Sequence, residues 1–139
     1  MAIGAEPDTL ARLALFADLG RPQLEAIAHT YDEELFGEGQ RVLRQGMSGG
    51  SLYVIVDGEA RVVRGEQELA RLGRGEFFGD VSALLGEPPT ADVVAQTPLR
   101  CLVIPGVDVD RFLLAYPPVA VRMLKAMVHR LATTLEWLG

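Results

Sequence analysis

The sequence predicts a mainly β domain, a β-sandwich or a β-roll, with helices at both ends. Eleven of the 15 glycines fall within residues 37–86, and short runs rich in Val, Ile, Leu, Tyr and Arg lie between them. Short strands separated by turn residues at this spacing are typical of sandwiches and rolls. The segments on either side instead repeat apolar residues at intervals of three and four, which indicates helices.

Residues 1–29 are predicted to form the N-terminal helices. Apolar residues recur at helical spacing after Pro7, and again after Pro22, which suits the first turn of a second helix. These positions are Leu10, Leu13, Ala14, Ala17, Leu24, Ile27 and Ala28. The second helix therefore carries its apolar residues on one face.

Residues 30–104 are predicted to form the β region, with strands at 52–56, 59–64, 67–72, 92–96 and 99–104. The dipeptide Asp57-Gly58 is the strongest two-residue hairpin signal, so the first two strands are predicted to be joined by a tight hairpin. Gly65-Glu66 separates the second strand from the third, and Thr97-Pro98 separates the last two.

Residues 105–139 are predicted to form a short helix near 107–115 and a long helix that starts at Pro117-Pro118. Apolar residues in the long helix alternate steps of three and four, as in a heptad seam. The seam consists of Val121, Leu124, Val128, Leu131, Leu135 and Leu138. It either joins two copies of the chain as a homodimer or packs on the chain's own β region. Met123 and Trp137 lie off the seam and are candidates to cover the opening of the roll.

The composition fits a single domain over residues 1–139 and excludes several classes of protein. Hydrophobic residues make up 49% of the chain and charged residues 23%, so the chain is neither disordered nor of low complexity. The net charge of −6 argues against direct nucleic-acid binding, which needs a basic surface. No apolar run is long enough for membrane insertion, and a single cysteine fits a reducing compartment, so we expect a cytoplasmic protein.

Neither a metal site nor a catalytic site is predicted. His29 and His129 lie on predicted helices at opposite ends of the chain, and neither has a His or Cys at the spacing of metal ligands. Cys101 lies in an apolar strand and is predicted to be inert core. Glu33 and Glu34 alternate with apolar neighbours near a sheet edge and are interpreted as a solvated strand face. We therefore expect a noncatalytic protein without a cofactor.

The segment 78–91, with the sequence FGDVSALLGEPPTA, interrupts the pattern of strands. Gly79 permits a sharp turn, and Asp80 suits the start of a short helix that ends at Gly86. Pro88-Pro89 then forces an extended exit. The first turn of such a helix presents unpaired N–H groups that can hold a phosphate. A plug that caps an open sheet end is an equally good interpretation.

The stretches 39–46, 51–59 and 72–79 resemble those of the cyclic nucleotide-binding domain family. The segment 15–19 before the β region and the long terminal helix agree with the same family. The resemblance implies a β-roll of the jelly-roll or double-stranded β-helix type, followed by a long C-terminal helix. It also implies a regulatory domain whose ligand is cAMP or cGMP.

In this family the segment equivalent to 78–91 is the phosphate-binding cassette. The resemblance implies that Asp80 meets the ribose, while backbone amides in the first turn of the helix, together with Thr90 and Ala91, meet the phosphate. The ligand-binding residues expected in the cassette are Gly79, Asp80, Val81, Ser82, Thr90 and Ala91. The long helix adds Thr134, at a position that contacts the base, although a Thr bonded to its own helix backbone explains that residue as well.

Two residues of the cassette differ from the family pattern. Glu is usual where this chain has Asp80, which is one methylene shorter. Arg is usual where it has Pro89, which offers neither a guanidinium nor an N–H. Losing a charge-assisted hydrogen bond should weaken binding by roughly ten- to a few-hundredfold. The candidate replacements for this arginine are Arg61, Arg64 and Arg74.

The predicted function is therefore a noncatalytic regulatory module that binds a cyclic nucleotide weakly or atypically, and that forms a homodimer through its C-terminal helix. One alternative is a ligand-independent dimerisation or protein-docking domain with the same fold. Another is the sensor half of a transcription regulator, whose helix-turn-helix would follow the long helix in a longer chain.

Overall fold

A computed structural model describes residues 2–47 and 50–136, with side chains as far as Thr133. The N-terminal elements are β1 (Ala2–Gly4), α1 (Pro7–Ala11), the 3-10 helix η1 (Ala14–Phe16) and α2 (Arg21–Thr30). The central elements are β2 (Asp32–Phe36), β3 (Arg41–Leu43), β4 (Ser51–Asp57), β5 (Ala60–Arg64), β6 (Gln67–Leu72), β7 (Phe77–Phe78), α3 (Asp80–Leu85), β8 (Asp92–Ala95) and β9 (Leu99–Pro105). The chain continues with α4 (Gly106–Ala115) and α5 (Pro117–Glu136). None of the described helices is long and apolar enough to cross a bilayer.

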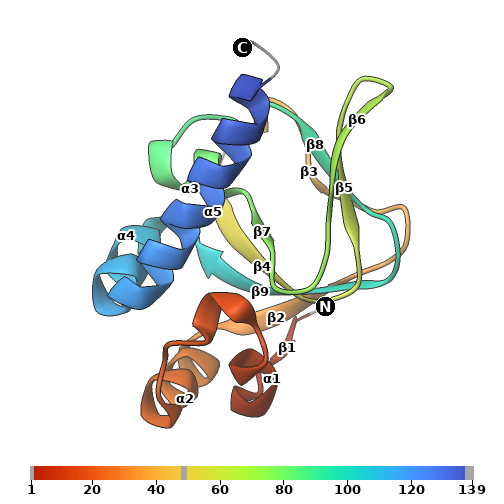
Figure 1. The fold of residues 1–139 in the computed structure, drawn as a ribbon. Helices are drawn as coiled ribbons and strands as arrows, with labels where there is room; N and C mark the ends of the chain where they lie inside the picture. The colour runs from red at the N-terminus through yellow and green to blue at the C-terminus, as the bar shows by residue number, and fades with distance from the viewer. Residues whose placement is uncertain (1, 48–49, 137–139) are drawn as a thin grey trace.

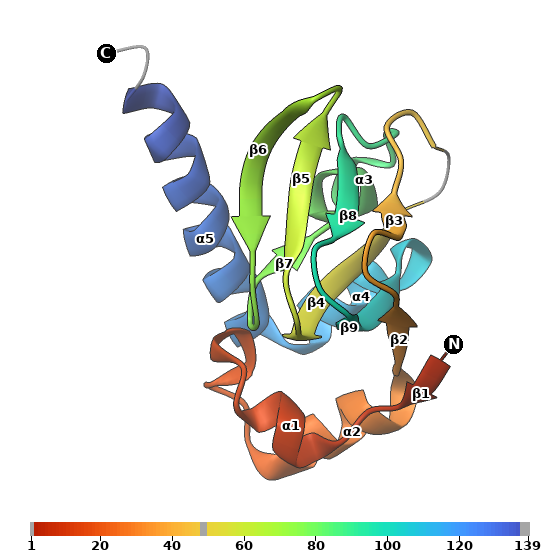
Figure 2. The same cartoon turned by 90° about the vertical axis from the view of Figure 1, so that its right-hand side faces the viewer.

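The strands form two antiparallel sheets that make up a β-roll, as predicted. One sheet has the order β1-β2-β9-β4-β7, and the other has the order β3-β8-β5-β6. Helices α3, α4 and α5 gather on one side of the roll, and α1 and α2 lie at one end (Figure 1). After a quarter turn, the four-stranded sheet faces the viewer and α5 stands beside it (Figure 2). The predicted fold class, mainly β with flanking helices, is confirmed.

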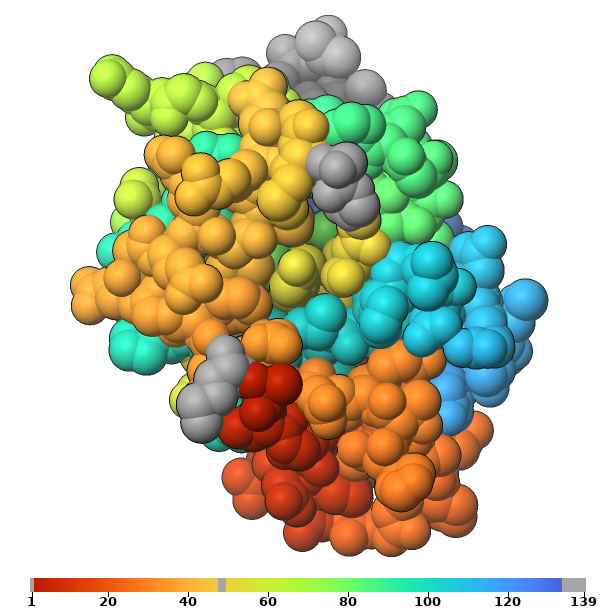
Figure 3. All heavy atoms as spheres, turned by 180° about the vertical axis from the view of Figure 1, so that it is seen from behind, coloured from red at the N-terminus to blue at the C-terminus, as the bar shows by residue number. Residues whose placement is uncertain are grey.

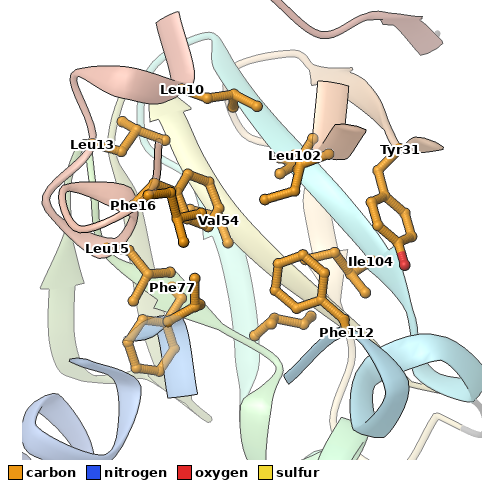
Figure 4. Close-up of a cluster of buried hydrophobic side chains, with 14 of the residues drawn as sticks. Leu10, Leu13, Leu15, Phe16, Tyr31, Val54, Phe77, Leu102, Ile104 and Phe112 are labelled. Carbon is orange, nitrogen blue, oxygen red and sulfur yellow. The ribbon is translucent and has the colours of Figure 1, made fainter. Parts of the chain in front are cut away.

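Two groups of buried side chains hold the helices to the roll and the two sheets to each other. The larger group joins the N-terminal helices, the five-stranded sheet, α4 and α5 (Figure 4). It includes Leu10 and Phe16 from the N-terminal helices, Leu102 from β9, and Phe112 from α4, each at most 1% exposed. The smaller group, around Ile55, lies between the sheets. Seen from behind, the cyan atoms of α4 lie next to the orange atoms of α2 and above them in the view (Figure 3).

The predicted hairpin at Asp57-Gly58 is wrong. Strand β4 pairs with β9 and β7, whereas β5 pairs with β6 and β8, so both edges of each strand are already occupied. The chain passes from one sheet to the other at Gly58, which has a φ of +94°. A Cβ there would lie 2.3 Å from the carbonyl oxygen of Pro98. The glycine is needed for a crossing between sheets, and the hairpin forms instead at Gly65-Glu66, between β5 and β6.

The prediction of a solvated Glu33 is also wrong. The side chain of Glu33 is fully buried, and its Oε1 accepts hydrogen bonds from Nε and Nη2 of Arg100, at 3.1 and 2.6 Å. Strand β2 is not an edge strand, because β1 pairs with it, and Glu33 lies opposite Leu102 of β9, a residue of the larger buried group. Glu34, its neighbour in β2, is half-buried.

Candidate functional site

The short helix α3 forms where the sequence predicts it, between two glycines with positive φ. Gly79 precedes the helix with a φ of +78°, and a Cβ there would lie 2.3 Å from the carbonyl oxygen of Ser51. Gly86 ends the helix with a φ of +71°, and its N–H donates to the carbonyl of Ser82. The absence of a side chain at residue 79 lets the backbone run close to Ser51. The first residues of α3 therefore lie against β4.

A cavity of about 260 Å³, here called the α3 cavity, lies between α3 and the four-stranded sheet. Its apolar side chains come from Leu43, Val62, Ala70, Leu72, Phe77, Phe78 and Val93. The rest of its wall is Gly79, Asp80, Val81, Ser82, Pro89, Thr90, Ala91 and Arg130. All six cassette residues predicted to bind ligand therefore line this cavity. The first turn of α3 therefore borders this cavity.

Asp80 supplies a buried carboxylate at one wall of the cavity. Its side chain is 8% exposed, and its Oδ1 lies 3.7 Å from Nη1 of Arg130. Burial raises the pKa of Asp80 above its ordinary value, while the Arg130 charge and the residue's own backbone N–H act in the opposite direction. The carboxylate is thus held in a poorly solvated place beside one cation.

Arg130 also lines the α3 cavity and was not predicted from the sequence. It comes from α5, and its Nη2 donates a 2.9 Å hydrogen bond to the carbonyl of Phe77. Its guanidinium carbon lies 4.5 Å from the centre of the Phe77 ring, within the range of a cation–π contact. The spacing of Arg130 from Thr134 is one signal that was available, because residues four apart share a helix face.

The three arginines that the sequence offered as substitutes for a cassette arginine, Arg61, Arg64 and Arg74, do not line the α3 cavity. Arg64 contacts a residue of the cavity wall, because its Nε donates to the carbonyl of Thr90 at 3.1 Å. Its guanidinium therefore holds the exit of the cassette in place from outside. Arg61 is half-buried, and Arg74 is exposed. Among the described residues, Arg130 is the arginine in the cavity wall.

The segment after α3 is fastened to neighbouring loops and strands. The N–H of Gly46 donates to the carbonyl of Pro89 at 3.0 Å, and the N–H of Gln45 donates to Oδ1 of Asp92 at 2.6 Å. The hydroxyl of Ser82 donates to the carbonyl of Glu87 at 2.5 Å. The Ser82 hydroxyl therefore already donates a hydrogen bond within the cassette. Thr90, by contrast, is an exposed residue of the cavity wall.

Comparison with known proteins identifies the family. The model of the "Cyclic nucleotide-binding domain" matches residues 33–116, which is more than half of the chain. The chain belongs to this family. Its cassette therefore lies within a cyclic nucleotide-binding regulatory domain, and the family predicted from the sequence is confirmed.

Individual relatives carry this domain in longer proteins. The cGMP-dependent protein kinase egl-4 of Caenorhabditis briggsae is 34% identical over 95 residues, a match to 64% of this chain and 13% of the kinase. Catabolite activator protein of Thermus thermophilus is 26% identical, with a TM-score of 0.79 over 89% of this chain and 61% of that protein. The regulatory subunit of a cAMP-independent protein kinase A from Trypanosoma brucei is 23% identical, with a TM-score of 0.74 over 88% of this chain and 45% of that subunit.

The long helix of this cyclic nucleotide-binding domain leaves most of its predicted seam uncovered. Its side chains at Val121, Leu124, Val128 and Leu131 are 49–61% exposed, so these residues do not pack on the chain's own roll. Val119 and Met123, on another face, lie in the core. The side chains of Thr134 and Leu135 lie outside the described part, as do Trp137 and Leu138.

The described residues of the domain contain no cluster of three His, Cys, Asp or Glu side chains that could hold a metal. Cys101 is fully buried in β9. Burial raises the pKa of its thiol to about 12, so the thiolate that reacts with electrophiles is scarce at neutral pH. The prediction that Cys101 belongs to the core is confirmed.

Proposed function

We propose that this chain is a noncatalytic regulatory domain that binds cAMP or cGMP in the α3 cavity. The observation that carries the proposal is the composition of the cavity wall. It combines the six predicted cassette residues with a guanidinium from α5, in a domain whose sequence lacks the cassette arginine. A cyclic nucleotide needs an apolar surface for its base, hydrogen-bond donors for its phosphate and a cation near that phosphate. The cavity wall contains all three.

The residues have separate roles in this proposal. The cyclic phosphate lies at the first turn of α3, near Gly79, Val81 and Ser82, with Thr90 and Ala91 across the cavity. Asp80 accepts a hydrogen bond from the ribose. Arg130 supplies the guanidinium that Pro89 cannot. Because Arg130 also pairs with Asp80 and the Phe77 carbonyl, we expect weaker phosphate binding than a cassette arginine would give. Thr134 remains a proposed contact to the base.

Ligand binding in this arrangement changes the contacts of α5. Arg130 now pairs with Asp80 and with the Phe77 carbonyl, and a phosphate in the cavity competes for the same guanidinium. A ligand that binds one position of α5 more tightly than another shifts the population toward it. The helix would carry the signal to whatever part of a longer protein follows.

Calorimetry with cAMP and cGMP on the full chain tests this function. We expect measurable binding of at least one nucleotide, and a loss of about tenfold or more in Arg130→Gln, from one charge-assisted hydrogen bond. The matched control is Arg44→Gln, which removes the same charge from an exposed position outside the cavity. Absence of both heat and melting shift at millimolar nucleotide would exclude the proposal.

A second candidate function, homodimerisation through α5, rests on the exposed seam. Four large apolar side chains in one row are well placed to pack against a second copy in a coiled coil. Sedimentation should show a dimer that Leu124→Glu dissociates and that Leu114→Glu, an exposed leucine of α4, does not. A monomer at all concentrations would rule it out.

A further inference from the structure

A second cavity, of about 270 Å³, lies on the other side of Phe77 and Arg130. We call it the η1 groove, because η1 and the turn before β7 form one wall and α5 forms the other. Its lining residues are Ala14, Leu15, Gly75, Glu76, Phe77, Arg122, Lys125, Ala126, His129 and Arg130. None of the six predicted cassette residues belongs to it.

One wall of the η1 groove is lined with nitrogen donors. Arg122, Lys125 and His129 are spaced by three and four, so they lie on one face of α5. The whole chain has a net charge of −6, yet the only acidic residue of α5 is Glu136, at its last position. The concentration of donors here is therefore a local feature and not a consequence of composition.

The carboxylates near the groove already have partners. Asp18 accepts hydrogen bonds from Nε and Nη2 of Arg122 at 2.5 and 3.2 Å. Oε2 of Glu76 accepts the N–H of Gly73 at 2.6 Å. Among the described residues, the side chains of Lys125 and His129 make no hydrogen bond. These two donors can therefore bind a ligand without breaking an existing hydrogen bond.

Apart from Glu76, whose Oε2 is paired as described, the opposite wall of the groove is apolar. Leu15 and Phe77 are at most 5% exposed and lie next to each other (Figure 4). Ala14 and Ala126 extend this surface. A ligand that satisfies both walls needs an apolar body with one anionic group, and inorganic ions or neutral hydrocarbons satisfy only one of them.

We propose that the η1 groove is a second binding site, for a small organic anion with an aromatic or aliphatic body. Lys125 and His129 bind its carboxylate or phosphate, and its body lies on Leu15 and Phe77. The site is separate from the α3 cavity but shares Arg130 and Phe77 with it. An occupant would therefore contact the same arginine that pairs with Asp80.

Amide chemical shifts of the ¹⁵N-labelled full chain test the proposal. Titration with phenyl phosphate and, separately, phenylacetate should move the amides of Ala14, Leu15 and Gly75, which line only the groove. The two probes distinguish a phosphate from a carboxylate. Benzyl alcohol, which is neutral, should move these amides at least about tenfold less at equal concentration.

Two substitutions test whether the probes bind in the η1 groove. Lys125→Gln should weaken probe binding about fivefold to tenfold, and Arg44→Gln, with the same change of charge away from the groove, should leave it unchanged. Shifts confined to the cassette amides, or equal binding by Lys125→Gln and the unmodified chain, would overturn the proposal. Failure of cyclic nucleotide binding would leave these readouts unaffected, because they report on different residues.

Discussion

Asp80 and Arg130 meet at the wall of the α3 cavity, with Oδ1 of the aspartate 3.7 Å from Nη1 of the arginine. Only 8% of the Asp80 side chain is exposed, against 39% of the Arg130 side chain. The arginine therefore keeps contact with water, while the carboxylate depends on its neighbours to remain charged. This asymmetry makes Asp80 the more pH-sensitive partner of the pair.

We expect Asp80→Asn to change the pH dependence of stability in a defined direction. The pKa of Asp80 is raised in the folded protein above its ordinary value of 3.8, mainly by burial. The folded state therefore binds this proton more tightly than the unfolded state, so the contribution of Asp80 to stability falls as the pH rises through and above 3.8.

Urea unfolding of both proteins between pH 3 and pH 7 measures this effect. The free energy of unfolding of Asp80→Asn, minus that of the unmodified chain, should rise with pH over this interval. Arg130, the cation that faces Asp80, remains charged throughout. A difference that is flat or that falls with pH would contradict the assignment of a raised pKa to Asp80.

Restoring an arginine at residue 89 should strengthen nucleotide binding. Pro89 lines the α3 cavity and is half-buried, so an arginine there would have access to the proposed phosphate site. Under the proposed function, Pro89→Arg should tighten binding of cAMP or cGMP by about tenfold to a hundredfold, measured by calorimetry. Pro88→Arg is the control, because Pro88 is exposed and outside the cavity wall. An equal gain in both variants would indicate nonspecific attraction of the anion.

The sequence was sufficient for the parts of the fold that depend on local conformation. Gly79 and Gly86 are needed for their positive φ, which is a property of the backbone at one residue, so the bounds of α3 were predicted correctly. The partners of strands were harder to predict. Gly58 has the local conformation expected of a turn, but the partners of β4 and β5 are set by strands far along the chain.

The residues of the candidate site also divide into those predicted from a local segment and those brought in by contacts between distant elements. The predicted cassette residues all lie within the segment 78–91 and were predicted together. Arg130 belongs to another element, and only the packing of α5 against Phe77 brings it to the cavity. Glu33 was misjudged for a related reason. It pairs with Leu102, a residue of the larger buried group that lies far along the chain, and β2 is an inner strand because of β1, a strand of three residues with no strong pattern of its own.

Gly79→Ala should destabilise the protein more than Gly86→Ala does. Both residues have positive φ, so each alanine introduces backbone strain of about 1 kcal/mol. At Gly86 a Cβ meets nothing within 4 Å, whereas at Gly79 it lies 2.3 Å from the Ser51 carbonyl oxygen. The clash should bring the total loss for Gly79→Ala to about 3 kcal/mol or more. Urea denaturation measures both, and equal losses would show that β4 moves freely to make room.

The buried pair of Glu33 and Arg100 should respond unequally to loss of either partner. Glu33 is 0% exposed and Arg100 is 38% exposed, so only the arginine has access to water. Arg100→Met leaves a buried carboxylate without its cation, which should lower the free energy of unfolding by about 3 kcal/mol. Glu33→Gln keeps an oxygen that can accept from Arg100 and removes the buried charge, so its loss should be about 1 kcal/mol. Urea denaturation at pH 7 gives both values, and a larger loss in Glu33→Gln would mean that the pair is held together by something other than burial of the carboxylate.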